Sequence, residues 1–192
     1  MHQDFSALSE IIVRRRNIKP AQMNGQSIPE EQIVQLLHMA DWAPTHGRTE
    51  PWRFYVFAGD KVRQFCADHA EMRRKAAPDL SQESYDRLSS MGDKASHVIL
   101  AVMRRGHLPK IPQLEEVLAV GAALQNLWLS AESLGIAVYW GTGGSVLEPE
   151  MKEYLSLREE DLVVGALYLG YTDEPVKPGT RNVPVSEKIH WM

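Results

Sequence analysis

The sequence predicts a sandwich of helices around one β-sheet, of the α/β or α+β class. Apolar runs at 52–58, 97–103 and 162–171 are typical of strands, and between them apolar residues recur at the three- and four-residue steps of helices. Because these strands and helices alternate with short connections, we expect layers around a single core. The chain has 192 residues, 44% hydrophobic and 24% charged, which fits one domain spanning 1–192.

A long helix is predicted to begin at Gln113 and to end at Gly135. Two glutamates occupy its first turn, and few charges interrupt its apolar surface from 117 to 131. A helix that is apolar around most of its surface is buried on several sides. Gly121 and the alanines beside it would let another helix approach closely. That helix could belong to the same domain or to a second subunit, and periodicity alone leaves both open.

The remaining segments are predicted as shorter helices, a further strand and an extended tail. The tail from 172 to 192 carries three prolines, so we expect it to lie on its own domain or on a partner subunit. The further strand covers the apolar run 136–140. The helices are expected at about 4–16, 29–43, 61–74 and 148–155, with a short one near 85–91.

Charge and cysteine content argue against several functional classes. The formal net charge of −4 gives no reason to expect nucleic-acid binding. No apolar run reaches membrane-spanning length and the first residues lack the features of a signal peptide, so no membrane association is expected. The one cysteine, Cys66, excludes an intrachain disulfide and fits a cytoplasmic location. It falls on the apolar phase of the helix at 61–74, so we interpret it as core rather than nucleophile.

Motifs for side-chain catalysis and for metal binding are missing from the sequence. It contains no Walker-type loop, no His-Glu-x-x-His, no paired cysteines and no Gly-x-Ser-x-Gly elbow. We therefore predict neither a metal site nor a catalytic side chain. A glycine-rich turn at 141–144 follows the strand at 136–140. However, Val146 stands where the dinucleotide fingerprint needs its last glycine.

Two basic clusters are the strongest chemical signal that remains. Cations at a helix end offset the helix dipole, which would explain one or two of them, and an anionic ligand is the equal alternative. Together with the glycine turn, the clusters suit a flat, phosphorylated cofactor better than catalysis by side chains. The first cluster is Arg14, Arg15, Arg16 and Lys19, and the second is Lys177 and Arg181.

Six segments, in order, carry a family signature that spans almost the whole chain. They are Arg15-Arg16-Asn17-Ile18-Lys19, Ala43-Pro44-Thr45-His46, Pro51-Trp52-Arg53-Phe54, Gly121-Ala122-Ala123-Leu124-Gln125-Asn126, Leu167-Tyr168-Leu169-Gly170, and Lys177-Pro178 with Arg181. Each is short, but the ordered set is specific. It resembles the FMN-dependent nitroreductase family, and most of all its short, YdjA-like branch.

The resemblance implies FMN as the cofactor and a set of residues that hold it. Arg15 and Lys19 would contact the FMN phosphate and ribityl chain, and Arg181 would complete the phosphate site from the tail. Forked guanidinium groups suit phosphate, because they offer paired donors. The flavin ring would be lined by Arg16 and Asn17, by Trp140, Gly141 and Thr142 along its reactive face, and by Trp42 and His46 from the other subunit.

The resemblance also implies a fold and an activity. The fold would be an α+β three-layer sandwich with a mixed central sheet flanked by helices. Two chains would form an intertwined homodimer, with the tail 172–192 on the neighbour. Electrons would pass from NAD(P)H to nitro compounds, quinones or related small-molecule acceptors by a ping-pong mechanism, with the chemistry carried by the flavin. The alternatives are a specialised relative that dehalogenates or fragments flavin, and a non-catalytic flavin-binding protein.

Three places depart from the family pattern. Asn17 replaces a serine and can still donate and accept hydrogen bonds. Arg48 and Thr49 stand where many members carry Asn-Ser. Glu50 replaces a glutamine, and its carboxylate would have to point away from a reduced flavin or pair with Arg53 or Arg48.

Overall fold

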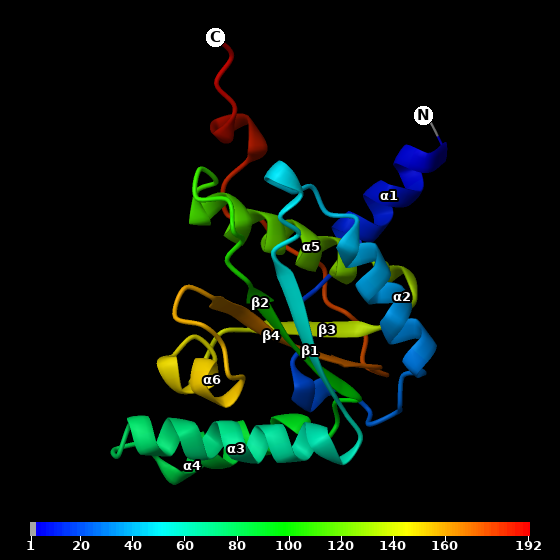
Figure 1. Ribbon diagram of the computed structural model, residues 1–192. Helices are drawn as coiled ribbons and strands as arrows, with labels where there is room; N and C mark the ends of the chain where they lie inside the picture. Colours follow the sequence, from blue (N-terminus) through cyan, green and yellow to red (C-terminus); the bar gives the residue numbers. More distant parts are fainter. Residues whose placement is uncertain (1–2) are drawn as a thin grey trace.

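The computed structural model describes residues 3–192 as three layers, with helices on both faces of one sheet (Figure 1). The sheet has four strands in the order β1-β2-β4-β3, and each neighbouring pair is antiparallel. This arrangement confirms the α+β sandwich. The strands are β1 (Trp52–Ala58), β2 (His97–Met103), β3 (Ala137–Gly141) and β4 (Leu162–Gly170).

Parallel pairing is confined to the edge of this sheet. Within residues 3–192, Asn17 and Val138 form an isolated parallel bridge outside the four strands. The segment around Asn17 adds this one parallel pair to β3 and does not form a fifth strand. The expected mixed pairing is therefore limited to this bridge.

One face of the sheet is covered by α5 (Gln113–Ser133) and α2 (Glu30–Asp41). α5 ends before Gly135, whose φ of 70° is the left-handed conformation that favours glycine at a helix end. Leu124 and Leu127 of α5 lie in one buried cluster with Leu36 of α2. Neither α5 nor any other helix within residues 3–192 is long and apolar enough to cross a membrane.

The opposite face is covered by α3 (Asp60–Ala76), α4 (Gln82–Ser89) and α6 (Pro149–Tyr154) (Figure 1). The core on this face includes Phe65 and Cys66 of α3 and Leu100 of β2. Burial raises the pKa of the Cys66 thiol to about 12, so its interpretation as core is confirmed.

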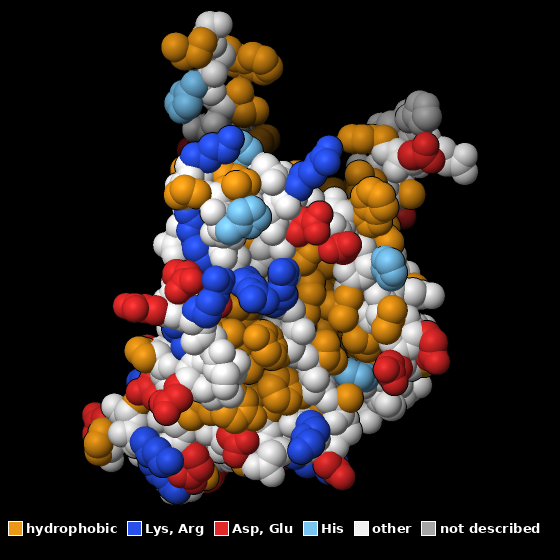
Figure 2. All heavy atoms as spheres, in the orientation of Figure 1, with side chains coloured by type: hydrophobic (Ala, Val, Ile, Leu, Met, Phe, Trp, Pro, Cys, Tyr) orange, Lys and Arg blue, Asp and Glu red, His pale blue; other side chains and the backbone are white. Residues whose placement is uncertain are grey.

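Two segments project from the layers on the same side of the molecule. They are α1 (Gln3–Arg14) and the tail, which contains a short 3₁₀ turn, Val185–Lys188 (Figure 1). α1 buries no residue, and hydrophobic side chains are exposed along both segments (Figure 2). Examples are Phe5 (60%) and Val13 (71%) on α1, and Val185 (71%) and Trp191 (92%) on the tail. A single chain therefore leaves much of their apolar surface uncovered.

A buried imidazole, that of His69, lies in the core between α3 and the sheet. Only 1% of its surface is exposed, and its ring stacks on Phe65 with 5.7 Å between centroids. Burial disfavours the charged form and lowers the pKa of His69 to about 4, from 6.5. The imidazole is therefore neutral at physiological pH.

We expect this histidine to make folding stability depend on pH. Between about pH 6.5 and about pH 4 the unfolded chain binds a proton at His69 that the folded chain does not. The free energy of unfolding should therefore fall by roughly 3 kcal/mol as pH falls through this window. Urea unfolding at several pH values would measure it. His69→Gln should show a shallower pH dependence than wild type, and equal slopes in the two proteins would contradict the assignment.

Candidate functional site

The segment that carries the first basic cluster docks along the edge strand β3. The main-chain N–H of Ile18 donates to the carbonyl oxygen of Val138 at 3.0 Å. The side-chain Oδ1 of Asn17 accepts from the main-chain N–H of Trp140 at 2.8 Å. Residues 15–19 therefore run beside β3, although 123 positions separate Asn17 from Trp140. Six of the ten expected cofactor residues are brought together in this way: Arg15, Arg16, Asn17, Lys19, Trp140 and Gly141.

Three guanidinium groups gather where this segment meets the C-terminal tail. Arg15 stacks over Trp128, with 4.2 Å from its guanidinium carbon to the ring centroid. Arg16 Nε donates to the carbonyl oxygen of Lys177 at 2.9 Å, which holds the tail beside the cluster. The pKa of Arg15 is lowered, first by burial and then by the positive charges of Arg16 and Arg181. An anion bound here would relieve this repulsion.

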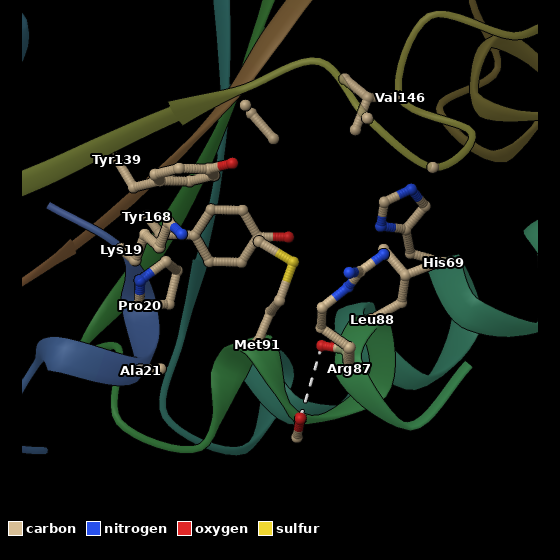
Figure 3. Close-up of a pocket in the computed structure, with 15 residues that line it drawn as sticks. Lys19, Pro20, Ala21, His69, Arg87, Leu88, Met91, Tyr139, Val146 and Tyr168 are labelled. Atoms are coloured by element: carbon tan, nitrogen blue, oxygen red, sulfur yellow. Dashed lines mark hydrogen bonds between the residues drawn. The ribbon is translucent and has the colours of Figure 1, made fainter. Parts of the chain in front are cut away.

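A cavity of about 380 Å³ lies on the α3–α4 side of β3 (Figure 3). Two of the expected cofactor residues, Lys19 and Gly141, are in its wall. Because side chains alternate along a strand, Tyr139 and Gly141 share this side of β3. Sequence reasoning missed the rest of the wall, which comes from several elements and includes His69, Arg87, Leu88, Met91 and Tyr168.

The same alternation turns the indole of Trp140 to the other face of the sheet. Its ring packs against Trp128, with 6.1 Å between centroids. A Cβ on Gly165 would lie 2.0 Å from its Nε1, so the indole fits only over glycine. Trp140 thus reaches the docked segment through its main chain. Its expected place along the flavin ring stays a prediction.

The glycine turn that follows β3 is held from behind by His69. The main-chain N–H of Ser145 donates to Nε2 of His69 at 2.9 Å. Gly144 has a φ of 70°, and a Cβ there would lie 2.5 Å from the same nitrogen. Only glycine therefore allows this contact. Thr142 is exposed in this turn. His69 follows Cys66 by three residues on α3, but nothing in the sequence links it to Ser145, which is 76 positions away.

His46 lies at the opposite end of α5 from the arginine cluster. Its Nδ1 is 2.6 Å from a carboxylate oxygen of Glu115 in the first turn of α5, whereas Arg14 binds Glu132 near the last turn, also at 2.6 Å. The rise of an α-helix puts these two glutamates about 25 Å apart. Trp42 follows α2 and is 80% exposed. One chain therefore does not bring His46 to the cluster.

The polar loop before β1 has an unusual backbone. Arg48 and Glu50 have φ values of 52° and 42°, a conformation that side chains other than glycine rarely adopt. Glu50 forms no ion pair with Arg48 or Arg53 within residues 3–192. Instead, the guanidinium of Arg53 donates to the main-chain oxygen of Glu50 at 2.9 Å.

Curated proteins resemble this chain along most of its length. The chain is 27% identical to YfhC of Bacillus subtilis (strain 168), over 100% of this chain and 97% of that protein. YfhC is named as an NAD(P)H nitroreductase. It is 29% identical to the 5,6-dimethylbenzimidazole synthase of Rhodospirillum rubrum, over 86% of this chain and 80% of that protein.

Solved structures share the fold. A nitroreductase-like protein from Bacillus cereus superposes with a TM-score of 0.82 at 24% identity, over 96% of this chain and 95% of that one. A nitroreductase from Desulfovibrio desulfuricans in complex with FMN superposes with a TM-score of 0.73 at 21% identity, over 96% of both chains. The family model described as "Nitroreductase family" matches residues 12–171. The chain therefore belongs to the nitroreductase family.

Proposed function

We propose that this chain is an FMN-dependent oxidoreductase that passes electrons from NAD(P)H to small-molecule acceptors such as nitro compounds or quinones. The observation that carries this proposal is the docking of residues 15–19 along β3. It places a cluster of guanidinium groups and a cavity bordered by glycine beside the same edge strand. A phosphorylated molecule with a flat ring needs this pair of features.

The arginine cluster fits a phosphate. Burial lowers the pKa of Arg15, and the positive charges of Arg16 and Arg181 lower it further. Glu132 is the carboxylate whose negative charge acts on Arg15 and raises its pKa. This carboxylate already accepts a hydrogen bond from Arg14. A phosphate would supply the missing negative charge and would accept paired hydrogen bonds from the guanidinium groups.

The cavity fits part of a flat conjugated ring. Lys19 offers a cation to electronegative atoms at the ring edge, and Gly141 lets the main chain approach the ring closely. Bound FMN would supply the redox chemistry, accepting a hydride from the nicotinamide and delivering electrons to the acceptor. The residues of this chain bind and orient the ring and set its electrostatic surroundings. Reductant and acceptor would use one site in turn, which is a ping-pong mechanism.

A second copy of the chain is part of this proposal. Leu114 and Leu118 on the first turns of α5 are 67% and 62% exposed, and a Cβ on Gly121 would meet nothing within 4 Å. This open face, together with α1 and the tail, offers the apolar surface that a stable dimer buries. In a two-fold dimer, His46 and Trp42 of the partner subunit could complete the cofactor site that one chain leaves open.

Two other functions compete with this one. The first is that of a specialised flavin relative that dehalogenates or fragments flavin, and the similarity to a 5,6-dimethylbenzimidazole synthase shows that relatives with other named activities exist. A flavin-binding protein without catalysis is the third possibility. Flavin reduction separates them, because a reductase must take electrons from NAD(P)H and pass them to an acceptor without consuming its FMN.

We expect the purified protein to be yellow and to release FMN when denatured. Under anaerobic conditions NADH or NADPH should bleach the flavin absorbance, and a nitro compound or quinone should restore it, with the FMN recovered intact. A colourless protein that binds no added FMN would overturn the proposal. A yellow protein that NAD(P)H does not bleach would favour a binding protein, and loss of the FMN on turnover would favour fragmentation.

Arg15→Ala should weaken FMN binding. One charged hydrogen bond lost at the phosphate costs about 1.5–3 kcal/mol, so the Kd should rise roughly 10- to 150-fold. Titration of apoprotein with FMN, followed by fluorescence quenching, measures this. Arg63→Ala is the matched control, because Arg63 lies on α3 and faces Asp60 at 3.8 Å. Equal FMN affinity in wild type and Arg15→Ala would remove Arg15 from the site.

Leu118→Glu should break the dimer and reduce FMN retention. A carboxylate placed in a buried apolar interface without a partner is strongly unfavourable. Light scattering would report the mass, and absorbance the FMN content. Val56→Glu, at a 41% exposed apolar position on β1, should leave both unchanged. A dimeric Leu118→Glu protein with full FMN content would contradict the assigned interface.

A further inference from the structure

The cavity wall contains two buried polar groups that find no hydrogen-bond partner within residues 3–192. They are Nδ1 of His69 and the hydroxyl of Tyr168, and each residue is only 1% exposed. The Cys66 thiol lies beside the Tyr168 hydroxyl, and a thiol is only a weak hydrogen-bonding group. Native proteins rarely leave buried polar groups unpaired, so such groups mark places where a ligand or a water completes the structure.

The protonation state of His69 is fixed by its neighbour. Nε2 accepts the main-chain N–H of Ser145 at 2.9 Å and therefore carries no proton. In a neutral imidazole the proton must then be on Nδ1. His69 thus presents one N–H donor that the rest of the chain does not use.

This donor faces the cavity. Figure 3 shows the imidazole of His69 at the cavity wall, turned toward Met91 and Tyr168, with the Tyr168 hydroxyl pointing toward the same space. The glycine turn lies on the other side of the imidazole, at Nε2. The imidazole of His69 therefore contacts the glycine turn with Nε2 and faces the interior of the cavity with Nδ1.

We propose that His69 is a ligand-contacting residue, whose Nδ1–H donates a hydrogen bond to an acceptor atom at the polar edge of the flavin ring. This inference rests on the proposed function. Lys19 and Gly141 belong both to the cavity wall and to the expected cofactor residues, so a ring that touches both enters the cavity. A flavin edge carries carbonyl oxygens and a ring nitrogen that accept hydrogen bonds. An apolar ring would leave the Nδ1–H unpaired.

His69 also has a positioning role in this arrangement. Its Nε2 sets the main chain of Gly144 and Ser145, and its Nδ1–H meets the ring that this turn borders. The two roles require Nε2 to accept a hydrogen bond and Nδ1 to donate one. A neutral histidine supplies both, whereas a protonated one would lose the acceptor at Nε2.

The two roles can be separated by substitution. In His69→Gln, the side-chain oxygen can take the place of Nε2 and still accept the Ser145 N–H, but no donor remains at Nδ1. In His69→Asn, the amide nitrogen can take the place of Nδ1 and restore the donor. Thermal unfolding and light scattering establish that each variant is folded and has the wild-type mass.

The affinities of apoprotein for FMN and for riboflavin test the proposal, because riboflavin has the same ring and no phosphate. His69→Gln should raise both Kd values, each by about 2- to 10-fold, as for one neutral hydrogen bond. His69→Asn should recover most of this loss. Arg15→Ala is the matched comparison and should weaken the binding of FMN much more than that of riboflavin, because its strongest contact is with the phosphate.

The outcomes distinguish this inference from the proposed function. If wild type binds neither flavin, the proposed function falls and the inference with it. If wild type binds both and His69→Gln binds them equally well, only the inference is overturned. Wild type alone provides a second test, in protein labelled with ¹⁵N-histidine. FMN should shift the Nδ1–H resonance of His69 and protect it from exchange, and an unchanged resonance would also overturn the inference.

Discussion

The docking of residues 15–19 along β3 is the interaction on which the candidate site depends. β3 is an edge strand, so its main-chain groups on one side are free to bind another segment. Ile18 and Asn17 use two of them, at Val138 and at Trp140. Asn17 accepts this hydrogen bond with its Oδ1. Its amide NH₂ makes no hydrogen bond within residues 3–192. The replacement of serine at this position thus keeps a donor available beside the site.

This docking also explains the charge distribution. The chain as a whole is acidic, with a formal net charge of −4, yet the segment and the tail bring Arg15, Arg16 and Arg181 together. Stacking on Trp128 holds Arg15 in place, and the bond from Arg16 to the carbonyl oxygen of Lys177 holds the tail. These cations repel one another. A bound anion would attract each of them and so offset the repulsion.

Local sequence patterns were enough to predict where strands begin and end. They could not predict contacts that depend on residues remote in the sequence. The strands at 52–58 and 97–103 have the predicted bounds, because their apolar runs are bounded by turn residues. The packing of the Trp140 indole against Trp128 could not be predicted, because it depends on Gly165 of the neighbouring strand. The role of His69 could not be predicted, because its partner Ser145 follows the glycine turn and is remote in sequence. The arginines were found because their spacing along the chain is itself the signal.

The structure of one chain leaves apolar faces of α1, α5 and the tail uncovered. It also pairs His46 with the first turn of α5, whereas Arg14 pairs with Glu132 near the last turn. Both features agree with a site completed by a second copy. The most direct test is a crystal structure of the protein grown with FMN. We expect the phosphate among Arg15, Arg16 and Arg181 and the ring between Lys19 and Gly141. A flavin bound elsewhere, or a phosphate remote from these arginines, would contradict it.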